Sequence, residues 1–228
     1  MNKPCTNQDD WFLQRYGKFT SSEIYKLLKD DKVGQVFGAG AWTYIEQKAV
    51  ERTTHLAERP ELEEVKALLW GKVYEYPAYA AYVEATKNHT MTYLGTETPL
   101  FLEYEPLAKD CGGSPDIINI TSSNSIDLGA EIKCPKNPIF HFRRLVWKSQ
   151  WDILQHYPLV YAQMQHLLMI TGAVEWHFIS YDDRQLLKKN KIKIIEVKPD
   201  KKFQDNLDLR IRMAIKERDK LIQSHTNQ

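Results

Sequence analysis

The chain has 228 residues, of which 43% are hydrophobic and 27% charged, and its 31 basic residues nearly balance its 30 acidic ones. This is the composition of a globular protein large enough to bury a core. The chain has only three cysteines, too few for a disulfide framework, and they do not have the C-x-x-C spacing of a zinc or iron–sulfur site. No apolar run approaches the roughly 20 residues of a membrane span, and residues 1–10 lack a signal-peptide segment, so we expect a protein of a reducing cytoplasm.

The N-terminal part predicts helices. Thr20, Ser21 and Ser22 form a cluster of N-cap residues, and the apolar positions that follow predict a helix up to Leu28. A loop rich in glycine and charge is expected over Asp30–Ala41. Two further helices are predicted, Ala41–Glu51 and Glu61–Lys87, the second with an apolar face of Leu62, Val65, Leu69 and Val73 and a kink at Pro77.

The middle of the chain predicts strands. The segments are Thr98–Tyr104, Gly113–Ile120 and Ile126–Lys133, and the polar sequence TSSNS between the last two predicts a hairpin. A helical region over Pro138–Thr171, interrupted near Pro158, should end at Gly172.

The C-terminal part predicts two more strands and a closing helix. The strands are Val174–Ser180 and Ile192–Lys198, and an amphipathic helix follows from about Phe203. This order of elements predicts an α/β or α+β domain with a mixed central sheet flanked by helices.

One group of residues has the pattern of a phosphodiester hydrolase. Such a reaction needs a cation, and Mg²⁺ prefers two or three carboxylates, with a lysine beside them to polarise or deprotonate water. Glu131 and Lys133 share one face of a predicted strand because side chains alternate with a period of two. Asp116, on the partner strand of the hairpin, can face them.

The Glu-x-Lys pattern also begins at Glu64 and at Glu196. Glu64 lies in a predicted helix, where residues two apart diverge, which favours a solvated face. Glu196 ends a predicted strand and has Asp182 and Asp183 upstream, so it is a real alternative. The residues alone leave both strand patterns open.

Four sequence blocks resemble the phage lambda exonuclease family, also called YqaJ-type viral recombinases, within the PD-(D/E)-x-K nucleases. GGSPDIINI followed by GAEIKCP is similar to the family's S-P-D and E-x-K-C-P segments. WFLQRYGKFTSSE, ALLWGKVYE and YAQMQHLLMITG resemble its N-terminal, W-G-x3-E and A-Q-x-Q blocks. The resemblance runs from Trp11 to Gly172 and is loose after Tyr181.

The resemblance implies a single exonuclease domain over residues 1–228, with a catalytic core at about 61–180. It implies Mg²⁺-dependent digestion of linear double-stranded DNA from 5′ to 3′, with Mn²⁺ as a substitute, releasing 5′-mononucleotides and leaving a 3′ single strand. The implied partners are DNA ends, a single-strand annealing protein and two further copies in a trimeric ring. The implied setting is phage recombination in the cytoplasm of a bacterial host.

For the catalytic centre, the resemblance implies that Asp116 and Glu131 bind Mg²⁺ together with the main-chain carbonyl of Ile132. Lys133 would activate the attacking water. Glu75 would complete the acidic cluster.

Four further residues receive roles through the resemblance. Gln163 would position the scissile phosphate or the lysine. Arg15, with Ser22 at a helix N-terminus, would hold the 5′-terminal phosphate. Leu68 matches a position that wedges the DNA end apart, although an apolar helix residue usually belongs to a core.

The sequence departs from the family at two places. Ile117 stands where the family usually has glycine after the S-P-D aspartate, and Pro77 follows Glu75 by two residues and could re-aim that carboxylate. Two alternative functions remain: a site-specific or structure-specific endonuclease on the same core, and a DNA-end-binding module without catalysis.

Overall fold

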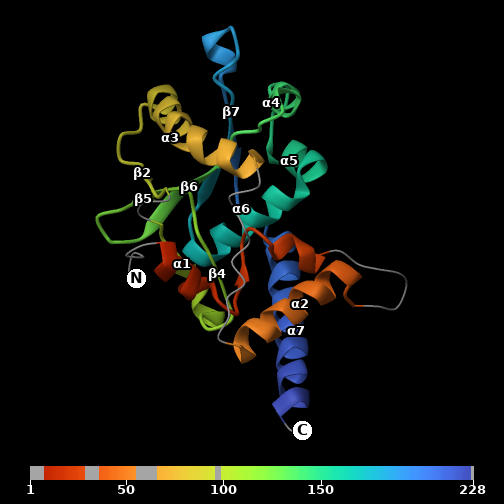
Figure 1. Cartoon of the computed structure of the whole chain (residues 1–228). Helices are drawn as coiled ribbons and strands as arrows, with labels where there is room; N and C mark the ends of the chain where they lie inside the picture. Colours follow the sequence, from red (N-terminus) through yellow and green to blue (C-terminus); the bar gives the residue numbers. More distant parts are fainter. Residues whose placement is uncertain (1–7, 29–35, 55–65, 96–98, 227–228) are drawn as a thin grey trace.

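A computed structural model describes residues 8–28, 36–54, 66–95 and 99–226 (Figure 1). The α-helices are α1 (Gln8–Arg15), α2 (Ala39–Thr53), α3 (Lys66–Thr86), α4 (Pro138–Arg144), α5 (Gln150–His156), α6 (Pro158–Thr171) and α7 (Lys201–Thr226). The strands are β1 (Phe19–Thr20), β2 (Thr92–Tyr93), β3 (Leu102–Glu103), β4 (Cys111–Gly113), β5 (Ile117–Ile120), β6 (Ile126–Lys133), β7 (Glu175–Tyr181) and β8 (Ile192–Val197). Short 3-10 helices are η1 (Ile24–Leu28), η3 (Glu105–Leu107) and η4 (Lys188–Asn190).

The larger sheet has five strands in the order β2-β5-β6-β7-β8. Strands β5 and β6 form the predicted antiparallel hairpin, β6 and β7 are parallel, and β7 and β8 are antiparallel. The prediction of a mixed central sheet is therefore confirmed. Strand β6 lies at its centre, which places Glu131 in the interior of the molecule.

Helices cover both faces of this sheet. Helix α3 packs on one face through the fully buried Ala78 and Tyr82, against Ala130 and Ile132 of β6. Helix α6 packs on the other face through Met164, Leu167 and Leu168, against Trp176 and Phe178 of β7. Because Glu131 pairs with Phe178 in register, its side chain lies on the α6 face.

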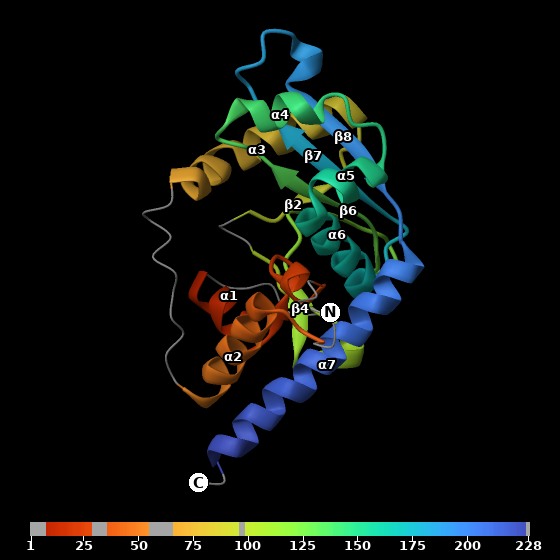
Figure 2. The ribbon, with the colours of Figure 1, turned by 90° about the vertical axis from the view of Figure 1, so that its right-hand side faces the viewer.

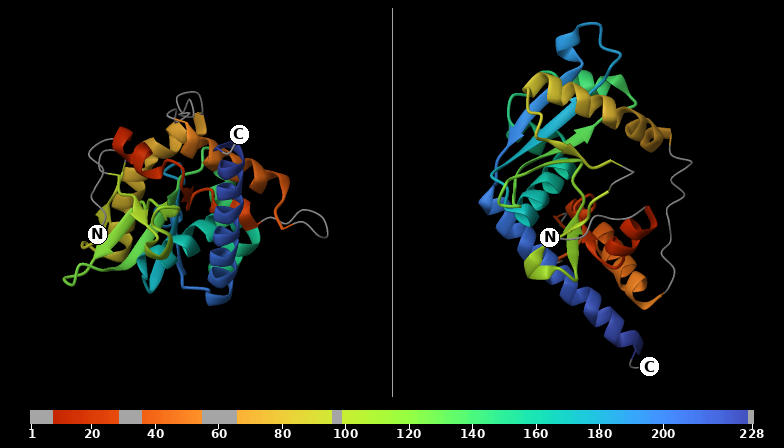
Figure 3. Two further views of the ribbon diagram at one scale, coloured as in Figure 1. Left: turned by 90° about the horizontal axis from the view of Figure 1, so that it is seen from below. Right: turned by 90° about the vertical axis from the view of Figure 1, so that its left-hand side faces the viewer.

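A second core lies on the far side of α6. The smaller sheet, in the order β1-β4-β3, packs there with η1, α2 and α7. In Figure 1, α6 crosses the centre of the molecule with α2 and α7 below it. Helix α7 passes α2 and extends away from the body at its C-terminal end (Figure 2, Figure 3). None of the described helices is long and apolar enough to cross a membrane.

The helix predicted up to Leu28 is present as the short 3-10 helix η1. Thr20, which was expected in an N-cap cluster, belongs instead to strand β1, which the sequence did not predict. Phe19 N–H donates to the carbonyl of Asp110, and Ser21 N–H donates to that of Gly112. These partners lie about ninety residues away in sequence, so a local N-cap pattern could not indicate them.

Two other expectations need correction. The strand predicted over Gly113–Ile120 is divided between the two sheets, because β4 ends at Gly113 and β5 begins at Ile117. The predicted apolar face of α3 is also wrong, since Leu69 and Val73 are exposed and Ala78 and Tyr82 are buried. Helix α3 continues through Pro77. Residues 29–35, 61–65 and 98 of the predicted segments lie outside the described residues.

Candidate active site

Asp116 lies on the connection between the two sheets, directly before β5. Its Oδ2 accepts a hydrogen bond from the main-chain N–H of Ile132 on β6, with an N–O distance of 2.7 Å. The hairpin therefore fixes Asp116 beside the strand that carries Glu131 and Lys133. The sequence prediction that these three residues face one another agrees with this geometry.

Glu131 is the most constrained group in the site. The residue is 1% exposed, and two donors converge on the same oxygen, Oε1. The Lys133 Nζ lies 2.5 Å from that atom, and the Gln163 Nε2 lies 2.7 Å from it. The other oxygen, Oε2, is buried without a hydrogen-bond partner among the described residues. Because a buried polar atom without a partner is costly, Oε2 marks a place for a further ligand.

Glu75 extends the acidic cluster from α3. Its Oε2 accepts a hydrogen bond from the Tyr93 hydroxyl of β2, with an O–O distance of 3.3 Å. Burial raises the pKa of the Glu75 carboxyl, and the nearby charge of Asp116 raises it further. Pro77 therefore leaves Glu75 within electrostatic reach of Asp116.

The carboxyl groups of the site resist ionisation. Burial and the charge of Glu131 raise the pKa of Asp116 from 3.8 to about 7. Burial also raises the pKa of Glu131, against the lowering effect of Lys133. Such crowding of acids, with Glu131 buried and Asp116 and Glu75 half-buried, disfavours the charged forms unless a cation joins them. The bare Oε2 and the oxygen-only acid set fit a hard divalent cation such as Mg²⁺.

Lys133 has its pKa raised because the attraction of Glu131 and Asp116 outweighs the lowering effect of burial. It is therefore held protonated in this arrangement. A protonated lysine can donate a hydrogen bond to water or phosphate but cannot remove a proton.

Gln163 donates to Glu131, which itself accepts from Lys133, and its expected role at the scissile phosphate stays a prediction. Gln165, two residues further along α6, serves the fold instead. It donates to the carbonyl of Lys198 and accepts from the N–H of Asp200, directly before α7. The A-Q-x-Q block therefore combines one site residue with one structural residue.

A second polar group lies at the other end of the Ser114–Asp116 connection. The Arg15 guanidinium lies 3.4 Å from the hydroxyls of both Ser22 and Ser114, and its carbon lies 4.1 Å from the Trp11 ring centroid. Trp11 Nε1 donates to the Ser114 hydroxyl at 2.8 Å. Arg15 and Ser22 are thus brought together as expected.

Ser114 was missed by sequence reasoning, although it belongs to the S-P-D segment that was singled out. Ser22 does not stand at the N-terminus of an α-helix, because the five-residue 3-10 helix η1 follows it. The groups that lie beside Arg15 are therefore the side-chain hydroxyls of Ser22 and Ser114, and the phosphate-binding role stays a prediction. The side chain of Leu68 lies outside the described residues, so its wedge role stays a prediction.

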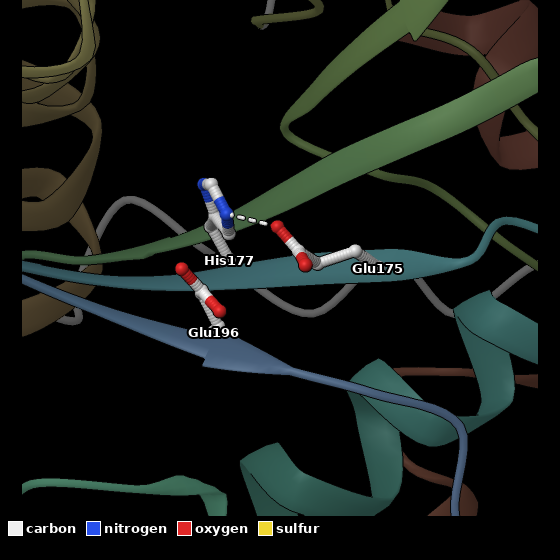
Figure 4. Close-up of side chains that lie close together, drawn as sticks. All are labelled: Glu175, His177 and Glu196. Carbon is white, nitrogen blue, oxygen red and sulfur yellow. Dashed lines mark hydrogen bonds and ion pairs between the residues drawn. The ribbon is translucent and has the colours of Figure 1, made fainter.

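The alternative pattern at Glu196 does not gather the expected aspartates. Asp182 pairs with Arg184, whose Nε lies 2.7 Å from its Oδ1. Glu196 instead lies beside Glu175 and His177 on the α3 face of the sheet (Figure 4). The ligand atoms of these three residues lie within 4.8 Å of one another, so this group is a rival place for a cation. Glu64 lies outside the described residues.

The shifted pKa of Asp116 predicts a pH-dependent stability in cation-free protein. Between pH 3.8 and about 7, the folded chain holds a proton that the unfolded chain has released, so the free energy of unfolding falls as pH rises. With a chelator present, the free energy of unfolding of Asp116→Asn should depend less on pH. At pH values above 7 the Tm of this variant should exceed that of wild type by at least about 2–4 °C, the equivalent of roughly 1 kcal/mol. Thermal unfolding across this range measures it.

Asp152→Asn is the control, and its effect on stability should have the opposite sign. Backbone N–H groups of Lys148 and Ser149 lower the pKa of Asp152 in the folded chain. This variant should therefore be less stable than wild type at pH values above the pKa of Asp152 in the unfolded chain. A pH dependence that is identical in wild type and Asp116→Asn would contradict the proposed burial of the Asp116 charge.

Comparison with known proteins gives the family. Residues 10–174 match the YqaJ-like viral recombinase domain. The chain is similar to the structure of an alkaline exonuclease, LHK-Exo, from Laribacter hongkongensis, and to LHK-Exo in complex with dAMP. Both have 22% identity and a TM-score of 0.76, covering 96% of this chain and 97% of that chain.

A phage-related exonuclease from Haemophilus somnus 129PT is similar at 15% identity and a TM-score of 0.66, covering 94% of this chain and 99% of that chain. No curated protein sequence matches significantly. The structural likeness confirms the predicted nuclease fold, and the domain match covers most of the chain. The chain belongs to the YqaJ-like viral recombinase domain family.

Proposed function

We propose that the protein is a Mg²⁺-dependent exonuclease that digests linear double-stranded DNA from 5′ to 3′ and releases mononucleotides. The observation that carries the proposal is the Glu131 carboxylate, with two donors on Oε1 and none on the buried Oε2. Asp116, Glu131 and the carbonyl of Ile132 would hold the cation, with Glu75 beside it. When bound, Mg²⁺ supplies the positive charge that offsets developing negative charge on the phosphate.

The residues of the chain then have separate tasks. Gln163 and Lys133 fix the orientation of Glu131 through its Oε1. Lys133, kept protonated by the two acids, orients the attacking water or the phosphate oxygen by donating a hydrogen bond. Asp116 accepts a hydrogen bond from the Ile132 N–H through Oδ2, which restricts the orientation of its carboxylate.

The sequence separation of the two polar groups supports a mononucleotide product. Ser114 of the proposed 5′-phosphate pocket stands two residues from Asp116, so the two residues lie at most about 7 Å apart along the chain. This is the scale of a single nucleotide. An end held at Arg15, Ser22 and Ser114 would therefore present the first phosphodiester bond to the carboxylates. Because the contacts are to phosphate, little sequence preference is expected.

The choice between the two carboxylate groups is tested by digestion. Asp116→Ala, Glu131→Ala or Lys133→Ala should lower Mg²⁺-dependent degradation of linear duplex by several orders of magnitude, because the cation contributes several kcal/mol to the transition state. Glu196→Ala is the matched control and should keep most of the activity. Loss of activity in Glu196→Ala with retention in Glu131→Ala would reverse the assignment. Cleavage of covalently closed circular DNA would favour an endonuclease instead.

The proposed phosphate pocket is tested by end chemistry. Arg15→Ala should slow digestion of 5′-phosphorylated duplex by about tenfold or more, since a charge-assisted contact is worth roughly 1.5–3 kcal/mol. It should affect ends with a 5′-hydroxyl much less. Arg212→Ala, which removes an arginine paired with Asp208 on α7, serves as control. Equal slowing on both kinds of end would indicate a general backbone contact.

We further propose that three copies form a ring and that the protein works with a single-strand annealing protein in the cytoplasm of a phage-infected bacterium. A chain with a net charge of +1 has little overall attraction for DNA, so repeated cleavage without release needs enclosure of the polymer or a local basic channel. Light scattering should give about three times the 26.7 kDa chain mass. A monomeric mass together with processive digestion would contradict the ring.

A further inference from the structure

A large cavity opens on the α4–α5 side of the sheet, next to the candidate active site. Its volume is about 1210 Å³, and its wall begins at Cys134, the residue after Lys133. The wall combines aromatic and charged side chains. The aromatic ones are Phe140, Phe142, Trp147 and Tyr157. It is large enough for a drug-sized organic ligand, for which pockets of roughly 300–1,000 Å³ are usual.

The charge of this wall is predominantly positive. Its lysine and arginine side chains are Lys136, Arg143 and Arg144, against the single carboxylate of Asp152. That carboxylate is already engaged, because its Oδ2 accepts hydrogen bonds at 2.9 Å from the N–H groups of Lys148 and Ser149 at the start of α5. Among the described residues that line the cavity, positive side chains therefore outnumber carboxylates.

Arg144 is the unusual member of this group. It is 6% exposed, yet among the described residues no carboxylate interacts with it. Its guanidinium carbon lies 4.6 Å from the Tyr157 ring centroid, and its Nη1 lies 3.3 Å from the Ser180 hydroxyl. Burial lowers the pKa of Arg144, which reflects the cost of holding this charge away from water.

The position of Arg144 connects the cavity to catalysis. Ser180, which accepts from Arg144, is the register partner of Lys133 across β6 and β7. An anion at Arg144 would therefore lie close to the proposed catalytic lysine. Two aromatic rings of the same wall, Phe140 and Phe142, are 50% and 67% exposed, which leaves room for a flat ligand against them.

We propose that this cavity is a nucleotide subsite that takes one nucleotide of DNA, with its phosphate at Arg144 and its base against Phe140 or Phe142. A phosphate supplies the charge that Arg144 lacks, and base stacking on an aromatic ring contributes without sequence preference. The nucleotide comes either from a DNA strand passing the active site or from the released mononucleotide. The biological meaning of this subsite rests on the proposed nuclease function, but its occupancy does not.

The test is a binding measurement by titration calorimetry on the whole chain, in a chelator, so that no cleavage occurs. The Arg15→Ala background removes the proposed terminal-phosphate pocket. The probes are dAMP, deoxyadenosine and a 5′-phosphorylated tetranucleotide. We expect dAMP to bind at least about tenfold more tightly than deoxyadenosine.

Variants then assign the binding to the cavity. Arg144→Gln should remove the preference for dAMP over deoxyadenosine while leaving the Tm unchanged or raised, because it removes a buried charge without an acid partner. Phe142→Ala, at an exposed position, should weaken both ligands by about threefold or more. Arg212→Gln, an arginine with a carboxylate partner outside the cavity, should change neither affinity. If Arg144→Gln does not fold, Phe142→Ala decides the matter, because weaker binding of both ligands supports the proposal and unchanged binding overturns it.

The outcomes separate the possibilities. A tetranucleotide that binds at least about tenfold more tightly than dAMP assigns the subsite to a strand, and equal affinities assign it to the released product. Binding of dAMP that is unaffected by the cavity variants, or a lower Tm in Arg144→Gln with unchanged binding, overturns the proposal. Binding that depends on Arg144 in a protein that does not digest DNA would refute the proposed function alone.

Discussion

The site depends on one buried carboxylate that two neighbours fix from the same side. Lys133 and Gln163 both donate to Oε1 of Glu131, and Oε2 is left inside the protein without a partner. A buried acid with a bare oxygen, crowded by Asp116 and Glu75, is unfavourable by itself. A divalent cation would relieve that cost. The same buried carboxylate of Glu131 would therefore both destabilise the cation-free fold and bind the catalytic ion.

The fold produces this arrangement by bringing together segments that are distant in sequence. The β5–β6 hairpin brings Asp116 to Glu131, α6 brings Gln163 across the face of the sheet, and α3 contributes Glu75 beside β2. The same β4–β5 connection that carries Asp116 carries Ser114, which contacts Arg15 of α1. A single short connection thus links the proposed phosphate pocket to the carboxylates.

Much of this could be predicted from the sequence, for identifiable reasons. Strand β6 and the hairpin follow from alternation and a polar turn, and the pairing of Glu131 with Lys133 follows from the strand period. Strand β1 and the division at Ser114–Asp116 could not be predicted, since their hydrogen bonds come from distant segments. The choice of Glu131 over Glu196 needed the family resemblance. The place of Ser114 in the proposed phosphate pocket is visible only in its contacts with Trp11 and Arg15.

The most direct test of the account is to locate the cation itself. Crystals soaked in Mn²⁺ and measured at the manganese absorption edge should show an anomalous peak between Asp116 and Oε2 of Glu131, at the coordination distance of about 2.0–2.2 Å expected for small divalent ions bound by oxygen. A peak only at Glu175, His177 and Glu196, with none between Asp116 and Glu131, would contradict the account.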